Sequence, residues 1–314
     1  MTRDLATTIT QLTADELLPI ISQSVREETI SCDTPTASKI GRSAGLATSG
    51  IFRVAGQAHT EHGERSWSAV VKILGPPEFD RPGVDYEPMR ELAVYRSGLF
   101  AQLRGLRSAR CYAIEERDGL VYLWLEDLSD APQPPWKPEH YVAAARHIGQ
   151  FNAHWPEDAL PQRDWLNREG FRAIFRSPYY QDRFDRFLAL QDHTLLRRAV
   201  PADVLPRLLQ LWEDSDELLA LAETAPMGVC HLDCHAKNLF PVHDSRHGAH
   251  TVAVDWTKVG ISCYGIDIGH MLSSAMKWLE LPPDQAQNLV DPVFDAYLAG
   301  LAQAGWSGDE DQVR

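Results

Sequence analysis

The stretch "VCHLDCHAKNLF", residues 229–240, decides between two different folds for this chain. Within ten positions it holds two cysteines, two histidines, an aspartate, a lysine and an asparagine. Such a set can build a zinc cage, or it can form the catalytic loop of a phosphoryl-transfer enzyme. The spacing of these residues, and the residues that follow them, distinguish the two interpretations.

A zinc site would use four side chains of this stretch: Cys230, His231, Cys234 and His235. Structural zinc sites commonly take two pairs of ligands, with the members of a pair about two to four residues apart. The nearest second pair, His243 and His247, falls in a polar turn where histidines are commonly solvated. The spacing therefore favours the catalytic loop of a phosphoryl-transfer enzyme, and a zinc site remains the alternative.

Phosphoryl transfer requires side chains that position the donor phosphates, hold Mg²⁺, orient the acceptor hydroxyl and take its proton. Asp233 could take the proton, and Asn238, five residues later, could bind the metal. A second metal-binding aspartate, Asp255, stands near the end of the apolar run "TVAVDW" (251–256). A strand over this run would bring Asp255 beside the loop, so the order and spacing of the three residues predict one site.

Two segments together resemble a known family: "HLDCHAKNLF" (231–240) and "VAVDWTKVG" (252–260). They are similar to the His-x-Asp-x4-Asn loop and the Asp-Trp segment of the aminoglycoside phosphotransferase and choline kinase-like family, which has the protein-kinase-like fold. The resemblance extends over roughly residues 35–300. It implies ATP and Mg²⁺ as cofactors.

The resemblance also implies roles for individual residues. Asp233 would be the catalytic base, Asn238 and Asp255 the Mg²⁺ ligands, and His231 the residue that holds the loop in shape. Lys237 departs from the family pattern, because members often have Pro-Gly at positions 236 and 237, and it adds a positive charge beside the acceptor.

Asp267 comes twelve residues after Asp255 and has two interpretations. The family shows a similar Gly-x-Asp, which implies that Asp267 supports the catalytic loop. An aspartate at the start of a helix is also a routine N-terminal cap.

The family further requires a lysine on an N-lobe strand that grips the α- and β-phosphates and pairs with a helix glutamate. Lys72 lies in the strand-like run "WSAVVKIL" (67–74), where a buried lysine is costly without a counter-charge. An edge-strand lysine kept for solubility is the alternative interpretation. Glu91, in "MRELAVY" (89–95), is the expected partner, and Glu87, one helical turn earlier, is a second candidate.

The segment "LVYLWLEDLSD" (120–130) resembles the family's hinge between lobes. The resemblance implies four adenine-site residues: Leu125, which would line the pocket, and Glu126, Asp127 and Leu128, whose backbone groups would hydrogen-bond the ring. The small residues of "GRSAGLATSG" (41–50) would form the flap over the phosphates, and an ordinary flexible loop is the alternative interpretation.

The expected fold class is α+β, with a small antiparallel β-rich N-lobe over residues 1–127 and a larger, mainly helical C-lobe over 128–314. Alternating runs and an Asp-Gly turn predict hairpins over 51–74 and 111–127. A helical periodicity predicts a helix over 87–103 between them.

Composition and charge exclude some classes of binding partner. The chain of 314 residues carries a net charge of −14, which argues against nucleic acid because phosphate contacts need clustered Lys and Arg. No run reaches the roughly 18 apolar residues of a membrane span. The polar N-terminus lacks a signal peptide's apolar core, and five cysteines without such a signal favour reduced thiols in the cytoplasm.

These observations predict an ATP-dependent O-phosphotransferase acting on a hydroxyl of a small molecule. The expected acceptor is an amino sugar, an aminoglycoside or another basic antibiotic. A kinase of a small metabolite, such as a choline- or ethanolamine-like amine, homoserine or a sugar, is an alternative. A nucleotide-binding pseudokinase is another, although four functional residues stand together against it: Lys72, Asp233, Asn238 and Asp255.

Overall fold

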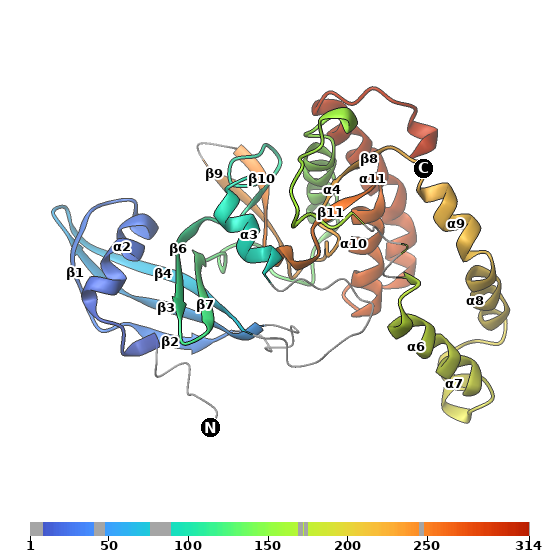
Figure 1. Ribbon diagram of the computed structural model, residues 1–314, viewed down its shortest axis with the longest axis horizontal. Helices are drawn as coiled ribbons and strands as arrows, with labels where there is room; N and C mark the ends of the chain where they lie inside the picture. Colours follow the sequence, from blue (N-terminus) through green and yellow to red (C-terminus); the bar gives the residue numbers. More distant parts are fainter. Residues whose placement is uncertain are drawn as a thin grey trace.

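The structure is a computed structural model that describes residues 9–40, 48–75, 89–168, 172, 175–244 and 248–313. It has two lobes, with a strand-rich one at the left of Figure 1 and a mainly helical one at the right. The α+β class expected from the sequence, a small antiparallel lobe followed by a larger helical one, is confirmed.

The N-terminal lobe is built on a six-stranded antiparallel sheet with the order β1-β3-β4-β7-β6, in which β2 also pairs with β3. The strands are β1 (Thr29–Cys32), β2 (Thr36–Lys39), β3 (Thr48–Thr60), β4 (Gly63–Leu74), β6 (Cys111–Arg117) and β7 (Leu120–Glu126). Helix α2 (Ala14–Val25) covers one face and buries its apolar stripe there. Both expected hairpins are present, and Asp118 and Gly119 turn the second with φ of 52° and 77°.

Helix α3 (Arg90–Ser97) follows the sheet's first hairpin and is shorter than the helix expected over 87–103. It ends because Gly98 adopts a left-handed φ of 63°, the usual C-terminal stop of a helix. Strand β5 (Leu106–Ser108) comes next and is not part of the N-lobe sheet. It pairs in parallel with β10 (Gly248–Ala253) of the C-terminal lobe. The segment after α3 therefore joins the two lobes.

Three long helices form the centre of the C-terminal lobe: α4 (Pro138–Asn152), α10 (Ile266–Lys277) and α11 (Pro283–Gln303). Two glycines let α4 and α11 approach closely, since a Cβ at Gly149 would lie 2.3 Å from the Tyr297 carbonyl oxygen and one at Gly300 would lie 2.0 Å from that of Arg146. A second group of helices lies at the far right of Figure 1: α6 (Pro178–Ala189), α7 (Thr194–Ala199), α8 (Val204–Glu213) and α9 (Ser215–Ala222).

Short strands in the C-terminal lobe frame the motif region. Strand β8 (Met227–Cys230) pairs with β11 (Gly260–Cys263), and β9 (Leu239–Asp244) pairs with β10. The described residues also include the one-turn helices η1 (Glu157–Ala159), η2 (Trp256–Lys258) and η3 (Glu310–Gln312). No helix in the described part of the chain is long and apolar enough to cross a membrane.

Candidate functional site

Residues 231–238 form a loop between β8 and β9, and Asp267 holds its first turn. The Asp267 carboxylate, buried at the start of α10, accepts the backbone N–H groups of His231 (2.9 Å) and Leu232 (2.8 Å). Leu232 has a left-handed φ of 62°, a conformation that costs energy for a branched residue. The two hydrogen bonds offset that cost, so Asp267 shapes the loop from outside it.

Asn152 and Tyr297 extend this support, and the sequence analysis did not find them. The Asn152 amide donates to Asp267 Oδ2 (3.1 Å) and to the Val229 carbonyl (2.8 Å), and the Tyr297 hydroxyl donates to Asn152 Oδ1 (2.9 Å). All three long helices therefore contribute to one buried network behind the loop. For Asn152, the sequence shows only an asparagine at the end of a largely apolar helical segment.

His231 connects the loop to the strand that precedes Asp255. Its Nδ1 accepts the Asp233 N–H (3.3 Å), so Nε2 carries the proton and donates to the Val254 carbonyl (3.0 Å). The ring is buried and lies 4.6 Å from the Trp256 ring. His231 therefore links the loop to the end of β10.

Asp233 and Asn238 face each other across the loop. The Asn238 amide donates to the Asp233 backbone carbonyl (3.2 Å) and to its Oδ2 (3.3 Å). The Val254 N–H donates to the Asn238 carbonyl (3.0 Å), which places Asn238 beside the end of β10. Asp255 follows directly, with a left-handed φ of 61°, and its Oδ1 accepts the Thr257 hydroxyl (3.0 Å).

Lys72 meets this group from the other lobe. Its Nζ lies 2.5 Å from Glu91 Oε2 and 3.2 Å from Asp255 Oδ1. Lys72 is buried and far from the edge of the sheet, because β4 pairs with β3 on one side and β7 on the other. Glu91 is therefore the helix glutamate that contacts Lys72 among the described residues, which do not include Glu87.

The electrostatics of this cluster keep Lys72 and Asp255 ionised. Burial would lower the pKa of Lys72, but the charges of Asp255 and Glu91 outweigh it and raise that pKa above its usual value. Burial would raise the pKa of Asp255, but Lys72 outweighs it and holds that pKa at about 2. The low pKa keeps the Asp255 carboxylate ionised. Its side chain is 36% exposed, so a ligand can reach it.

The donor atoms available fit Mg²⁺ better than zinc. Asn238 and Asp255 offer amide and carboxylate oxygens, the hard ligands that Mg²⁺ prefers. The Cys230 thiol instead contacts the carbonyls of Ser262 (3.6 Å) and Cys263 (3.8 Å), and burial raises its pKa well above the usual value. No group of three or more His, Cys, Asp or Glu side chains suited to a metal occurs among the described residues, which do not include His247.

The linker residues are held by ion pairs. Arg107 binds Glu126 with both terminal nitrogens (2.8 and 3.1 Å), and Arg53 lies 2.9 Å from Asp127 Oδ2. The Glu126 N–H and the Leu128 carbonyl already bond Arg110 and Ala131. Leu125 is buried between the sheet and the C-terminal lobe. The flap expected over 41–50 lies largely outside the described residues.

Two cationic residues of the site were missed. Lys258 Nζ lies 2.6 Å from Asp233 Oδ1. Arg90, next to Glu91, donates to the carbonyls of Trp165 (2.6 Å) and Thr257 (2.7 Å) and so ties α3 to η2. The sequence shows a lysine three residues after Asp255 and an arginine beside Glu91. Neither residue type indicates which group the side chain will contact in the fold.

The acceptor side of Asp233 carries two histidines and an aromatic ring. His235 Nε2 lies 3.9 Å and His270 Nε2 4.0 Å from the carboxylate. Burial lowers the pKa of His235 to about 4 and also lowers that of His270, so both rings are neutral near pH 7. The Trp278 ring lies against His235 and beneath the Lys237 ammonium (4.0 Å).

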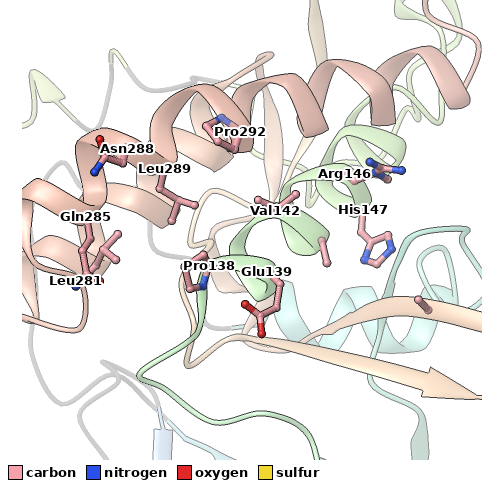
Figure 2. A pocket seen from close by; sticks show the side chains of 12 residues that line it. Pro138, Glu139, Val142, Arg146, His147, Leu281, Gln285, Asn288, Leu289 and Pro292 are labelled. Atoms are coloured by element: carbon pink, nitrogen blue, oxygen red, sulfur yellow. The ribbon is translucent and has the colours of Figure 1, made fainter.

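A separate hollow of about 780 Å³ lies between α4 and α11. Figure 2 shows Val142 and His147 of α4 facing it together with Leu289 and Pro292 of α11. None of the residues expected in the nucleotide or acceptor site lines it.

A family model described as the phosphotransferase enzyme family (APH) matches residues 59–308. No curated protein matches the chain in sequence. Among solved structures, amicoumacin kinase hAmiN in complex with AMP-PNP, Ca²⁺ and Ami is 13% identical, with 87% of this chain and 73% of that chain covered and a TM-score of 0.47. The GDP complex of aminoglycoside 2'-phosphotransferase-IIIa is 13% identical, with 94% and 91% covered and a TM-score of 0.45. Aminoglycoside phosphotransferase APH(3'')-Id from Streptomyces rimosus, in complex with ADP and streptomycin, is 14% identical, with 87% and 90% covered and a TM-score of 0.43.

Proposed function

This chain belongs to the phosphotransferase enzyme family with its protein-kinase-like fold, and on that premise we propose that it is an ATP-dependent O-phosphotransferase. It moves the γ-phosphate of ATP to a hydroxyl of a small molecule. One observation carries the proposal: an N-lobe lysine, Lys72, pairs with Asp255 at 3.2 Å, directly beside the loop that holds Asp233 and Asn238.

Each residue has a distinct task in the transfer. Asp233 orients the acceptor hydroxyl and takes its proton as the new oxygen–phosphorus bond forms. Lys72, fixed by Glu91, holds the α- and β-phosphates of the donor. Mg²⁺ held by the oxygens of Asn238 and Asp255 would neutralise phosphate charge. Catalysis then comes mainly from positioning and from charge already in place before the reaction.

The nucleotide base belongs at the linker, and we place the division between the lobes there, at residue 127. The side chains of Glu126 and Asp127 are occupied by Arg107 and Arg53, so the adenine ring would be read by backbone groups of residues 126–128 other than the Glu126 N–H and the Leu128 carbonyl. Leu125 would contribute apolar surface. A nucleotide-using enzyme with five unpaired cysteines suits the cytoplasm.

The acceptor we propose is an amine-bearing molecule: an amino sugar, an aminoglycoside or another basic antibiotic. Trp278, 36% exposed beside the catalytic loop, already accepts the Lys237 ammonium on its ring face. Such a face suits a substrate ammonium equally well. The net charge of −14 favours the approach of a cation in the same way.

The experiment is a coupled ADP-release screen with Mg²⁺ and ATP over amino sugars, aminoglycosides and small amino alcohols. A compound that raises ADP release, and is recovered phosphorylated by mass spectrometry, supports the proposal and names the acceptor class. A protein that binds ATP but releases no ADP with or without any compound would instead be a nucleotide-binding pseudokinase.

A further inference from the structure

Among the described residues, Lys258 forms the shortest polar contact to the Asp233 side chain. Its Nζ lies 2.6 Å from Asp233 Oδ1, while the Asn238 amide reaches Oδ2 at 3.3 Å. Asp233 is only 15% exposed on its side chain, whereas Lys258 is 41% exposed. The ammonium group therefore stands at the mouth of the site and touches the carboxylate proposed to take the acceptor's proton.

The backbone that carries Lys258 is firmly held. Lys258 ends η2, whose first residue, Trp256, is fully buried against Phe100 at 4.8 Å. The next carbonyl, that of Thr257, accepts a hydrogen bond from the Arg90 guanidinium (2.7 Å). A fixed turn thus delivers the lysine side chain to Asp233, and the contact does not depend on a mobile surface loop.

Lys258 also differs from the neighbouring basic residues in what it contacts. Lys237, the other lysine on this side, pairs with Glu280 at 3.4 Å and lies over Trp278. The two histidines within 4.0 Å of Asp233 are neutral near pH 7, because burial disfavours their charged forms. Among the described residues, the Lys258 ammonium is therefore the basic group in closest contact with the Asp233 carboxylate.

We propose that Lys258 is a catalytic residue that binds the transferring γ-phosphoryl group. This inference rests on the proposed function. The acceptor oxygen must lie within hydrogen-bond reach of Asp233, and the γ-phosphorus must lie in line behind it. A cation at hydrogen-bond distance from the same carboxylate reaches the equatorial phosphate oxygens of that assembly.

The acceptor oxygen forms a bond to phosphorus as the bond between phosphorus and the β-phosphate oxygen breaks, and the electron pair of that bond leaves on ADP. The acceptor proton passes to Asp233. The Lys258 ammonium offsets negative charge on the phosphoryl oxygens, where a fixed donor is most effective.

A purely structural role predicts something else. An ion pair with a lysine this exposed contributes little to folding stability. If Lys258 only completed that pair, replacing it would change neither stability nor turnover by much. A catalytic role predicts unchanged folding with a large loss of kcat, so the two roles separate in one set of measurements.

The test compares Lys258→Met, Lys258→Arg and Lys277→Met in the full-length protein. Lys277 is an exposed lysine at the end of α10 and serves as the matched control. The probe is Mg²⁺ with ATP alone, followed as ADP release to water, and then the same mixture with each acceptor found in the screen. Melting temperature and affinity for a non-hydrolysable ATP analogue are measured alongside.

We expect Lys258→Met to lower kcat about 100-fold, with KM for ATP changed less than about threefold and melting unchanged. Lys258→Arg keeps the charge and recovers part of the rate, and Lys277→Met behaves as wild type. A Lys258→Met variant with wild-type kcat, or with its loss confined to KM, overturns the role of Lys258 alone. Wild-type protein that turns over no nucleotide under any condition overturns the proposed function, and this inference with it.

Discussion

Lys72 Nζ lies 2.5 Å from Glu91 Oε2, and this buried ion pair joins strand β4 to helix α3. The lysine also lies 3.2 Å from Asp255 Oδ1, so one ammonium group serves two carboxylates, one from each lobe. Removing a single member of a buried ion pair leaves an uncompensated charge and is strongly destabilising. The three side chains are therefore coupled in stability as well as in position.

Lys72→Met should be the most damaging change in this cluster, because it leaves two carboxylates facing each other without a cation. We expect a loss of about 3–5 kcal/mol in the free energy of unfolding, measured by urea denaturation. Glu91→Gln should cost less, since Lys72 keeps Asp255 as a partner. Lys39→Met, at an exposed position of strand β2, is the control. Equal losses for Lys72→Met and Lys39→Met would contradict the assigned burial of the pair.

Asp233→Asn should abolish phosphoryl transfer and leave nucleotide binding intact. The amide keeps the size of the side chain but cannot take the acceptor's proton, and we expect kcat to fall by at least about 1,000-fold. Lys72, which is proposed to hold the phosphates, is unaffected by this change. Product formation and binding of a non-hydrolysable ATP analogue are measured together. Asp130→Asn, in the exposed linker, is the control, and near-wild-type turnover by Asp233→Asn would remove Asp233 from the mechanism.

Asp267→Asn distinguishes loop support from ordinary helix capping. An amide cannot accept the N–H groups of His231 and Leu232 as the carboxylate does, and loss of two charge-assisted hydrogen bonds should cost about 3 kcal/mol. Turnover should fall as well, because the loop that carries Asp233 loses its shape. Asp284→Asn, in the exposed first turn of α11, is the matched change at another helix start. If the two substitutions had similar effects on stability and turnover, Asp267 would act only as a helix N-terminal cap.

Arg90→Met should loosen the contact between the lobes. Its guanidinium is buried and donates to the Trp165 and Thr257 carbonyls. The substitution removes the donor from one buried and one partly buried acceptor, at a cost of about 3 kcal/mol. Because Thr257 lies within η2, we also expect a lower kcat. Denaturation and turnover are compared with Arg96→Met, on an exposed position of the same helix. If Arg90→Met and Arg96→Met are equally stable, α3 is held by other contacts.

The residues that meet in the site were predictable where the chemistry lies in a short motif. Asp233, Asn238 and Asp255 are separated by a loop and one hairpin, and the pairing of β9 with β10 brings them together almost automatically. Lys72 could be recognised because a lysine in an apolar central strand needs a nearby carboxylate. Glu91 was expected from the family resemblance, with Glu87 as a second candidate, and the contact of Glu91 with Lys72 comes from the structure.

The residues that were missed depend on packing between distant segments. Arg90 reaches Thr257, 167 positions later, and Asn152 reaches Asp267, 115 positions later. A single sequence carries no sign of such pairings, and Lys258 looks like any solvated lysine near a turn. The length of α3 was overestimated for a local reason, since Gly98 ends the helix despite the apolar periodicity beyond it.

Protonation of His147 should weaken the fold as the pH falls. Burial, with smaller contributions from His250 and Arg146, lowers the pKa of His147 to about 4, and its Nδ1 lies 2.9 Å from the Thr251 hydroxyl. The unfolded chain, with a pKa near 6.5, binds the proton first, so this contribution to stability is present above that pH and is lost as the pH falls toward 4. The loss amounts to about 3 kcal/mol at most. His147→Gln should therefore flatten the fall in unfolding free energy between pH 7 and pH 4.5, whereas His193→Gln, at an exposed position, should leave the wild-type slope unchanged. Parallel slopes for wild type and His147→Gln would assign the acid sensitivity to other groups.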